Sequence, residues 1–568
     1  MKTPVRIDSA LVPLLFTALI STCVVACDDD ETASGGGGAG SGAGGANGEG
    51  ASGAGGSTTT SGTGGWDARF DPLVAALEED LAESGAFGVS VAVLEKGEIT
   101  FAQAFGSKDQ AGTQPLTPHT LMQIGSTTKQ MTAAAVLQKV ESGSLSLDDD
   151  LESLLPMLDF ALDPTWDDQI LVRHLISHQG GFYDYTEWNQ LSDDARLASF
   201  TYGDFAESIY LMNPPGVFWN YSNPNFSVAG LITEELDTRA WPDIMREDIF
   251  VPLGMDRTFL RKSEVEADGD YALSYGLVGV GDNTPGEVSM GQMGDSAWVR
   301  PAGLAWTTPS QMATWSKFLI EGDDAVLGEA LRSEITSEQV DTGFLGGNLH
   351  YGYGMMVWRG YLTNDETWYP VRVWEHGGNT LSFTNSLTIL PDQEFAIVIT
   401  SSAFGTDFSH SVDVALETLV DLPAPTAAPE YEIDPATFGR HVGTYSDPYN
   451  IGDVIITEEG GDLHVSMPAL DAAGYDVDPI LVPVSSEIFV VFIEGTQLDL
   501  TFIPSTPGGD STYIRNRSFV ASRPEQMGLT SRGPAVASRD KIESALRRAR
   551  IDALPPSIVR SAVAASRK

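Results

Sequence analysis

The sequence has few basic residues and almost no cysteine. Its 568 residues include 32 Lys and Arg against 79 Asp and Glu, a formal net charge of −47. This balance argues against a nucleic-acid partner, because binding phosphates requires clustered Lys and Arg. The chain also lacks the Gly-x-Ser-x-Gly elbow of α/β-hydrolases and the metalloprotease and P-loop signatures. No metal or cofactor is therefore implied.

The N-terminus is typical of a signal peptide. Lys2 and Arg6 precede the apolar run 10–26, which is too short for a convincing permanent membrane span. The run ends in Val-Val-Ala before Cys27, which resembles the bacterial lipobox. The resemblance implies cleavage before Cys27, attachment of lipid to it, and loss of Cys23 together with any disulfide. An ordinary secretory signal with two incidental cysteines is the alternative.

Both N-terminal interpretations predict export. The lipobox predicts a membrane-anchored lipoprotein of the bacterial cell envelope, held by Cys27 and facing the periplasm or the exterior. Composition then divides the chain into a signal peptide (1–26), a lipidated cysteine with a flexible Gly- and Ser-rich linker (27–65), a main folded domain (66–425), a small β-domain (435–522) and a basic tail (526–568). We interpret the tail as a poorly ordered terminus containing a short helix; docking to a partner or a membrane surface is the alternative.

Hydrophobic periodicity predicts an α+β fold for the main domain. A helix over 67–84 precedes a hairpin with strands at 87–94 and 99–105, and strands return at 371–375, 381–390 and 395–400. Residues 145–370 are predicted to be mainly helical, including a capped helix that begins at Thr308. We therefore expect one antiparallel sheet built from both ends of the domain, with helices packed around it and an all-helical inserted region. Short apolar runs after 435 predict an all-β C-terminal domain.

The motif Ser126-Thr-Thr-Lys129 is the first candidate for chemistry. Residues three apart share a helix face, so a helix beginning at Ser126 would hold the Lys129 amine beside the Ser126 hydroxyl. A helix N-terminus and burial both disfavour an ammonium, which would let Lys129 act as a base. The alternative is a serine cap with an exposed lysine. Ser538 and Lys541 repeat the same spacing in the tail.

Two further polar elements follow in order. Tyr221-Ser222-Asn223 offers a tyrosine that could shuttle protons and an amide that could orient a substrate; a polar turn is the alternative. His376-Gly377-Gly378-Asn379 lies between predicted strands. Its glycines would let a substrate approach the backbone closely, so that an amide there could complete an oxyanion hole.

In this order, on helix, loop and strand, the three elements resemble the penicillin-binding and serine β-lactamase superfamily. The most similar branch is class C-like and includes D-alanyl-D-alanine carboxypeptidases, D-aminopeptidases and family VIII esterases; segments 173–181 and 301–310 also resemble it. The resemblance implies a β-lactamase/transpeptidase-like fold. His178 lies in one of these segments, and we interpret it as a structural residue. The resemblance also implies a nucleophile, a base and a proton shuttle at Ser126, Lys129 and Tyr221, and substrate contacts at Asn223, His376, Gly378 and Asn379, with the amides of Ser126 and Asn379 forming the oxyanion hole.

One departure affects the expected substrate. Class C β-lactamases usually carry Lys-Thr-Gly on the third element, and this chain has neither Lys-Thr-Gly nor Lys-Ser-Gly. Histidine is charged only part of the time near neutrality, so it anchors a substrate carboxylate more weakly. We therefore expect a serine hydrolase for D-amino-acid peptides or esters. The alternatives are a class C-type β-lactamase and a non-catalytic penicillin-recognising scaffold. The C-terminal β-domain resembles the lipocalin-like barrel of this branch, and the oligomeric state stays open.

Overall fold

The computed structural model describes residues 65–184, 193–277, 285–429 and 432–523. The predicted signal peptide, Cys27, all but the end of the linker, and the basic tail lie outside these residues. Within the described ranges, no helix has the length and apolar character needed to cross a membrane.

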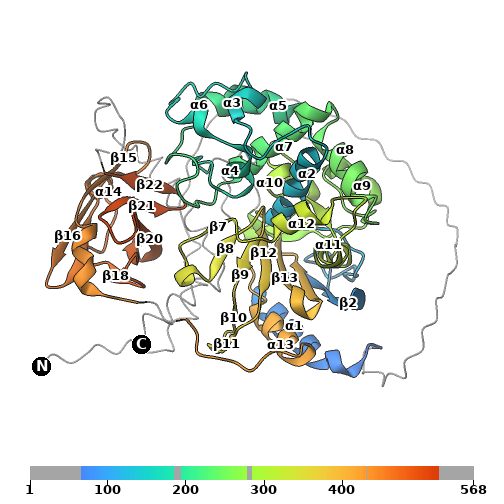
Figure 1. Cartoon of the computed structure of the whole chain (residues 1–568). Coiled ribbons are helices and arrows are strands. Elements are labelled where there is room, and N and C mark those ends of the chain that lie inside the picture. The colour runs from blue at the N-terminus through green and yellow to red at the C-terminus, as the bar shows by residue number, and fades with distance from the viewer. Residues whose placement is uncertain (1–64, 185–192, 278–284, 430–431, 524–568) are drawn as a thin grey trace, which may run out of the picture.

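The main sheet joins the two ends of the main domain, as predicted (Figure 1). Its eight strands run in the order β2-β1-β14-β13-β12-β9-β8-β7. The early strand β1 (Gly88–Glu95) pairs antiparallel with the late strand β14 (Phe395–Ser401). Strand β12 of this sheet contains residue 378 and packs against the turn that contains residue 126. The other strands are β2 (Glu98–Gly106), β7 (Val340–Asp341), β8 (Leu349–Tyr351), β9 (Met356–Trp358), β12 (Val373–Asn379) and β13 (Thr384–Leu390).

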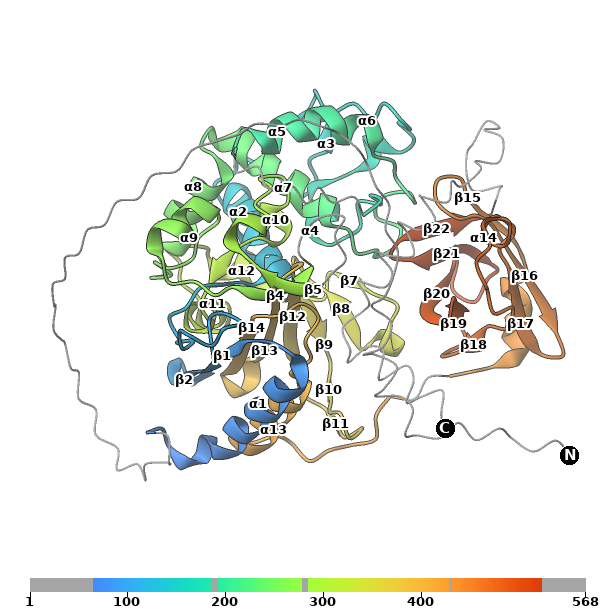
Figure 2. The ribbon, with the colours of Figure 1, turned by 180° about the vertical axis from the view of Figure 1, so that it is seen from behind.

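Helices cover both faces of the sheet. The helices α1 (Asp71–Ser84) and α13 (Ser409–Leu419) lie side by side on one face, and α2 (Lys129–Glu141) and α11 (Pro309–Glu321) lie on the other (Figures 1 and 2). Phe70, just before α1, stacks on Phe101 of β2 with ring centroids 4.5 Å apart. Trp315 of α11 donates to Gln130 of α2 at 2.6 Å. The first nine residues of α2 are buried, as expected for a central helix.

Helices predominate among the elements that follow α2, but the prediction of mainly helical structure up to about residue 370 was wrong at its end. Strands β7 to β9 extend the main sheet there. Each is only two or three residues long, too short for an alternating pattern to show in the sequence. The remaining helices and strands of the main domain are α3 (Leu151–Leu154), α4 (Val172–Ile176), α5 (Arg196–Phe200), α6 (Ala206–Ser208), α7 (Asn223–Asp237), α8 (Trp241–Met245), α9 (Lys262–Asp268), α10 (Arg300–Gly303), α12 (Glu329–Ile335), β3 (Met122–Gln123), β4 (Ser274–Leu277), β5 (Pro285–Val288), β6 (Trp306–Thr307), β10 (Tyr361–Leu362) and β11 (Trp368–Tyr369).

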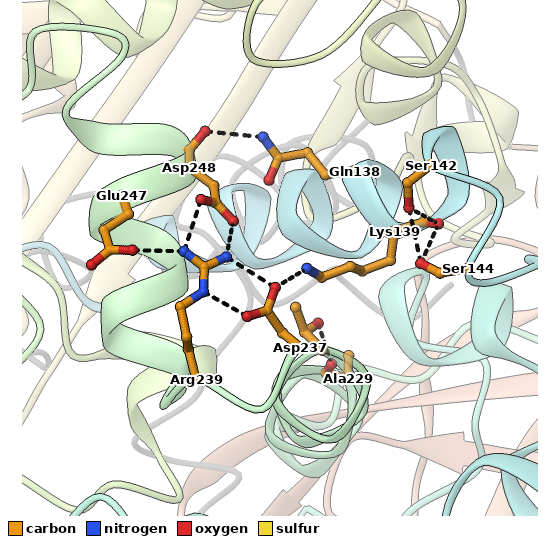
Figure 3. Close-up of polar contacts among 10 residues, drawn as sticks. Gln138, Lys139, Ser142, Ser144, Ala229, Asp237, Arg239, Glu247 and Asp248 are labelled. Carbon is orange, nitrogen blue, oxygen red and sulfur yellow. Dashed lines mark hydrogen bonds and ion pairs between the residues drawn. The ribbon is translucent and has the colours of Figure 1, made fainter.

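A network of charged side chains fixes the far end of α2 (Figure 3). Asp237, at the end of α7, accepts from Arg239 at 2.6 and 2.9 Å and also pairs with Lys139 of α2. Arg239 reaches Asp248 at 2.6 Å and Glu247 at 2.7 Å. The bonds from Arg239, with those from Lys139, hold the pKa of Asp237 well below its usual range. The helix that begins beside residue 126 is therefore anchored at its other end by a network that does not touch the candidate site.

The C-terminal residues form a second, barrel-like all-β sheet, as predicted. Its strand order is β17-β16-β15-β22-β21-β20-β19-β18, and it lies beside the β7–β8 edge of the main domain in both views (Figures 1 and 2). Its interior is filled by apolar side chains such as Leu463, Phe489 and Ile514. The elements are β15 (Gly443–Asp447), β16 (Gly452–Glu459), β17 (Asp462–Ser466), α14 (Pro468–Ala473), β18 (Val482–Pro483), β19 (Ile488–Ile493), β20 (Thr496–Pro504), β21 (Ser511–Asn516) and β22 (Phe519–Ser522).

Candidate active site

Ser126 lies in a tight turn rather than in the first turn of an α-helix. Residues Gly125–Thr128 form a 3-10 helix, and α2 begins at Lys129, whose N–H donates to the Ser126 carbonyl. Gly125 has φ +54°, a left-handed conformation that favours glycine. The predicted proximity of Ser126 and Lys129 nevertheless holds, since a 3-10 turn also stacks residues i and i+3.

The Lys129 amine is fully buried among three acceptors. Nζ lies 2.9 Å from Ser126 Oγ, 2.7 Å from Asn223 Oδ1 and 2.6 Å from the carbonyl oxygen of Ala302. These contacts match the three donors of an ammonium. When the amine is neutral, the Ser126 hydroxyl can donate to its lone pair over the same distance. The pair therefore has the geometry for proton transfer from serine to lysine.

Tyr221 and Asn223 reach the same point from the start of α7. Lys129 Nζ lies 4.9 Å from the centroid of the Tyr221 ring. The Asn223 side-chain amide donates to Asp184 Oδ1 at 3.1 Å, and its backbone N–H donates to the same oxygen at 2.8 Å. These bonds orient the amide so that Oδ1 faces Lys129. Asp184 was not predicted, because a single aspartate in a loop gives no motif.

Strand β12 approaches the Ser126 turn so closely that only glycine fits. A Cβ on Gly378 would lie 1.8 Å from the Ile124 oxygen and 3.0 Å from Ser126 N. A Cβ on Gly125 would in turn lie 2.6 Å from Asn379 N. The two backbone amides predicted for the oxyanion hole are thus held near each other.

Thr127 ties the Ser126 turn to two strands. Its hydroxyl lies 2.8 Å from Asn385 Oδ1 on β13 and 3.2 Å from the His376 carbonyl on β12. Thr128 adds a bond to the Gly125 carbonyl at 2.8 Å. The threonines of the motif therefore position Ser126, a role that the Ser-x-x-Lys spacing does not indicate.

The side chain of His376 is committed to the protein interior. It is 2% exposed; Nδ1 donates to the Gly377 carbonyl at 2.7 Å, and Nε2 accepts from the Tyr351 hydroxyl at 3.1 Å. Burial, with the charge of Lys129, lowers the pKa of His376 to about 3. The ring is therefore neutral at pH 7. The imidazole offers no charge for the substrate contact predicted at His376, so that any such contact would come from the backbone of β12.

His178 packs directly on Tyr221, with ring centroids 4.0 Å apart. It has φ +58°, and its Nδ1 accepts from the backbone N–H of Ser222 at 3.2 Å. Burial, with the charge of Lys129, lowers its pKa well below the usual value. A neutral, rigid imidazole thus supports the tyrosine, in agreement with the structural role expected for His178.

The described residues contain no group of three or more His, Cys, Asp or Glu side chains placed to hold a metal ion. They hold a serine hydroxyl beside a buried amine, a tyrosine ring whose centroid lies 4.9 Å from that amine, and two backbone amides brought near each other where β12 meets the Ser126 turn. A hydroxyl, an amine, a phenol and paired backbone amides are the kinds of group that acyl transfer uses as nucleophile, base, proton donor and oxyanion stabiliser.

Comparison with known proteins agrees with this geometry. The family model described as Beta-lactamase matches residues 73–422. The chain is 23% identical over 394 residues to Penicillin-binding protein 4* of Bacillus subtilis, and the matched region covers 65% of this chain and 81% of that protein. It is 28% identical over 269 residues to D-aminopeptidase of Gluconobacter oxydans, 46% of this chain and 47% of that protein. The chain spans about three fifths of the length of several other curated relatives.

A solved structure shares the fold. The D-amino acid amidase from Ochrobactrum anthropi SV3, complexed with L-phenylalanine amide, superposes with a TM-score of 0.52 at 23% sequence identity, covering 62% of this chain and 98% of that one. At this identity the likeness establishes the architecture alone.

Proposed function

Because the chain belongs to the β-lactamase family, we propose that it is an exported serine hydrolase that forms an acyl-enzyme at Ser126. Its proposed substrates are D-amino-acid peptides or amides, or esters. Export and a lipid anchor at Cys27 are part of the proposal and rest on the first 30 residues of the sequence alone. The observation that supports the hydrolase most strongly is the buried amine of Lys129, 2.9 Å from Ser126 Oγ.

The proposed reaction has two steps, acylation of Ser126 and hydrolysis of the acyl-enzyme, and the same groups act in both. Ser126 Oγ attacks the substrate carbonyl carbon and gives its proton to Lys129 Nζ. The carbonyl oxygen becomes an oxyanion that accepts from the amides of Ser126 and Asn379. Tyr221 passes a proton to the leaving nitrogen or oxygen as its bond to carbon breaks, and the proton is replaced from Lys129. Water then attacks the acyl-enzyme by the same route, and the acid and Ser126 are released.

The charge of strand β12 supports the choice of substrate. It carries no Lys or Arg, and its histidine is neutral at pH 7 because its pKa is about 3. A substrate carboxylate would therefore meet no cation on this strand, which favours amides and esters over ligands recognised through a carboxylate. The relative named D-aminopeptidase makes D-amino-acid amides and peptides the first substrates to test.

A second candidate function is covalent reaction with β-lactams. The relative named Penicillin-binding protein 4* favours it, and such a protein could be a class C-type β-lactamase or a penicillin-recognising scaffold without turnover. Penicillin would then acylate Ser126, and the rate of deacylation would separate the two.

Labelling and turnover test the proposal. We expect a fluorophosphonate to form a covalent adduct with the intact protein and Ser126→Ala to abolish it. Ser126→Ala and Lys129→Ala should each lower kcat by about 10³-fold or more, because nucleophile and base act as a unit. Ser538→Ala, in the second Ser-x-x-Lys of the chain, is the matched control and should leave turnover unchanged. A D-alanyl-D-alanine peptide, a D-amino-acid amide, a nitrophenyl ester and nitrocefin form the substrate panel. Retention of most activity in either variant would refute the assignment.

A further inference from the structure

A cation from the C-terminal sheet lies in the candidate active site. Arg517 occupies the turn between β21 and β22, yet its guanidinium carbon lies 4.3 Å from the centroid of the Tyr221 ring. Its Nη2 and Nε donate to Asp184 Oδ2 at 2.8 and 3.1 Å, across 333 positions of sequence. The site is therefore composed of residues from both sheets.

Asp184 links this arginine to the catalytic amine. Its side chain is 2% exposed, and a buried carboxylate needs a compensating partner. Arg517 binds one oxygen of Asp184. The other oxygen accepts the two N–H groups of Asn223, whose Oδ1 in turn accepts from Lys129 at 2.7 Å. A continuous chain of polar contacts thus runs from the C-terminal sheet to the nucleophile.

The turn that carries Arg517 is fixed against the main domain. Arg515 of β21, two residues before Arg517, is 2% exposed and donates to the carbonyl oxygens of Trp219 at 2.8 Å and Thr342 at 2.7 Å. Burial lowers the pKa of Arg515 to about 10, so it remains charged near neutrality. Asn220 adds a bond to the Asn516 carbonyl at 3.4 Å. Trp219 and Asn220 directly precede Tyr221, so the docked strand also supports the tyrosine.

We propose that the C-terminal sheet completes the active site, with Arg517 as a positioning residue that neutralises Asp184, stacks on Tyr221 and keeps Lys129 available as a base. The inference rests on the proposed function and assigns it a second structural unit. Arg517 acts through its neighbours: it holds Asp184, which orients Asn223, and its charge disfavours a second cation at Lys129.

The titratable side chains around this group come from several elements. His178 follows α4 and lies against Tyr221; Tyr351 of β8 and His376 of β12 lie behind it. Burial lowers the pKa of both histidines and raises the pKa of Tyr351 well above 10, so all three are neutral at pH 7. Asp184 and Arg517 therefore carry charges in this polar chain while these three side chains carry none.

The sign of the effect follows from these charges. Without Arg517, the uncompensated carboxylate of Asp184 attracts the Lys129 ammonium, and less of the amine is neutral at a given pH. A phenolate at Tyr221 also loses its neighbouring cation. Both changes move the acidic limb of the pH–rate profile upward, whichever of the two groups it reports.

The test compares pH profiles of kcat/KM for a nitrophenyl ester, using the full chain. We expect Arg517→Met to lower kcat/KM at pH 7 by about 10- to 100-fold and to raise the acidic limb by about one pH unit. Arg517→Lys should lie between Arg517→Met and the wild type. The double variant Asp184→Asn/Arg517→Met removes both charges and should return the limb toward the wild-type position. Arg440→Met, which breaks a pair with Glu487 beside the same sheet, is the control and should change neither value.

Two outcomes overturn the inference in different ways. If the wild type forms the fluorophosphonate adduct and Arg517→Met keeps the wild-type pH profile, Arg517 is merely structural and the proposed function stands. A loss of kcat at every pH without a shift of the acidic limb would also make Arg517 merely structural. A lower melting temperature of the variant would then attribute the loss of kcat to lower stability. If the wild type forms no adduct, the proposed function fails and the inference falls with it.

Discussion

A methyl group added at Gly378 should impair catalysis, whereas one added at Gly377 should not. The Gly378 Cβ would lie 1.8 Å from the Ile124 oxygen and 2.8 Å from the Ile124 carbon. Non-bonded carbon and oxygen atoms need about 3.3 Å or more, so β12 and the Ser126 turn must separate by on the order of 1 Å. At Gly377 the nearest atom to the added Cβ is the Asn385 oxygen, at an ordinary 3.8 Å.

The expected magnitudes follow from that displacement. Overpacking of this kind costs about 1–3 kcal/mol of stability. A misplacement of about 1 Å in donors aimed at a developing oxyanion costs about 100-fold in rate. We therefore expect Gly378→Ala to lower the rate of acylation about 100-fold while the protein stays folded. Gly377→Ala should stay within about twofold of the wild type, since added contacts at 3.8 Å cost little.

The assay is single-turnover acylation by a nitrophenyl ester, with thermal unfolding measured on the same samples. Acylation isolates the step that the oxyanion hole serves, and the melting curve shows that the variant is folded. Equal acylation rates in the two variants would refute the close approach of β12 to Ser126 and, with it, the oxyanion hole at Asn379.

Two further predictions concern stability. Asp237→Asn, in the network of Figure 3, should lower the free energy of unfolding by about 1–3 kcal/mol, because Arg239 and Lys139 lose a charged acceptor. Urea unfolding measures this loss. A fall in kcat would contradict the separation of the network from the candidate active site. His441 is buried between Ser511 and Ser486, and burial lowers its pKa to about 4. The unfolded state binds the extra proton between about pH 6.5 and 4, so stability falls as pH drops through this window, by up to about 3 kcal/mol from this group. His441→Asn should flatten the difference between urea unfolding at pH 7 and pH 4.5, and an unchanged difference would contradict a neutral buried imidazole.

The parts of the fold that the sequence predicted correctly are those with long, regular patterns. The hairpin of β1 and β2 and the late strands β12 to β14 span seven to nine residues each, enough for an apolar pattern bounded by turn residues to be recognised. The sequence also predicted one sheet built from both ends of the domain, but the pairing of β1 with β14 within it comes from the structure. Strands β7 to β9 and the 3-10 turn at Ser126 were missed, since two to four residues give no period.

The same distinction applies to the site. Ser126, Lys129, Tyr221 and Asn223 were predictable because each stands in a short motif, and the structure brings all four together. Asp184 and Arg517 were not predictable, because their relation exists only across 333 positions. The sequence signal available for Arg517 is a basic residue in a tight turn between two apolar strands, and such turns normally carry solvated charges. Only docking of the C-terminal sheet places that charge against Tyr221.

The positions of the two arginines and of His376 also restrict the substrates. A carboxylate on a substrate would need a cation with hydrogen-bond donors to spare. Arg517 spends its Nε and Nη2 on buried Asp184, and Arg515 is committed to backbone carbonyls at 2.7 and 2.8 Å. His376 on β12 is neutral and bonded at both ring nitrogens. Arg515 and His376 thus serve the protein itself, and Arg517 is paired with a buried carboxylate, which favours substrates whose scissile amide or ester is recognised through neutral contacts.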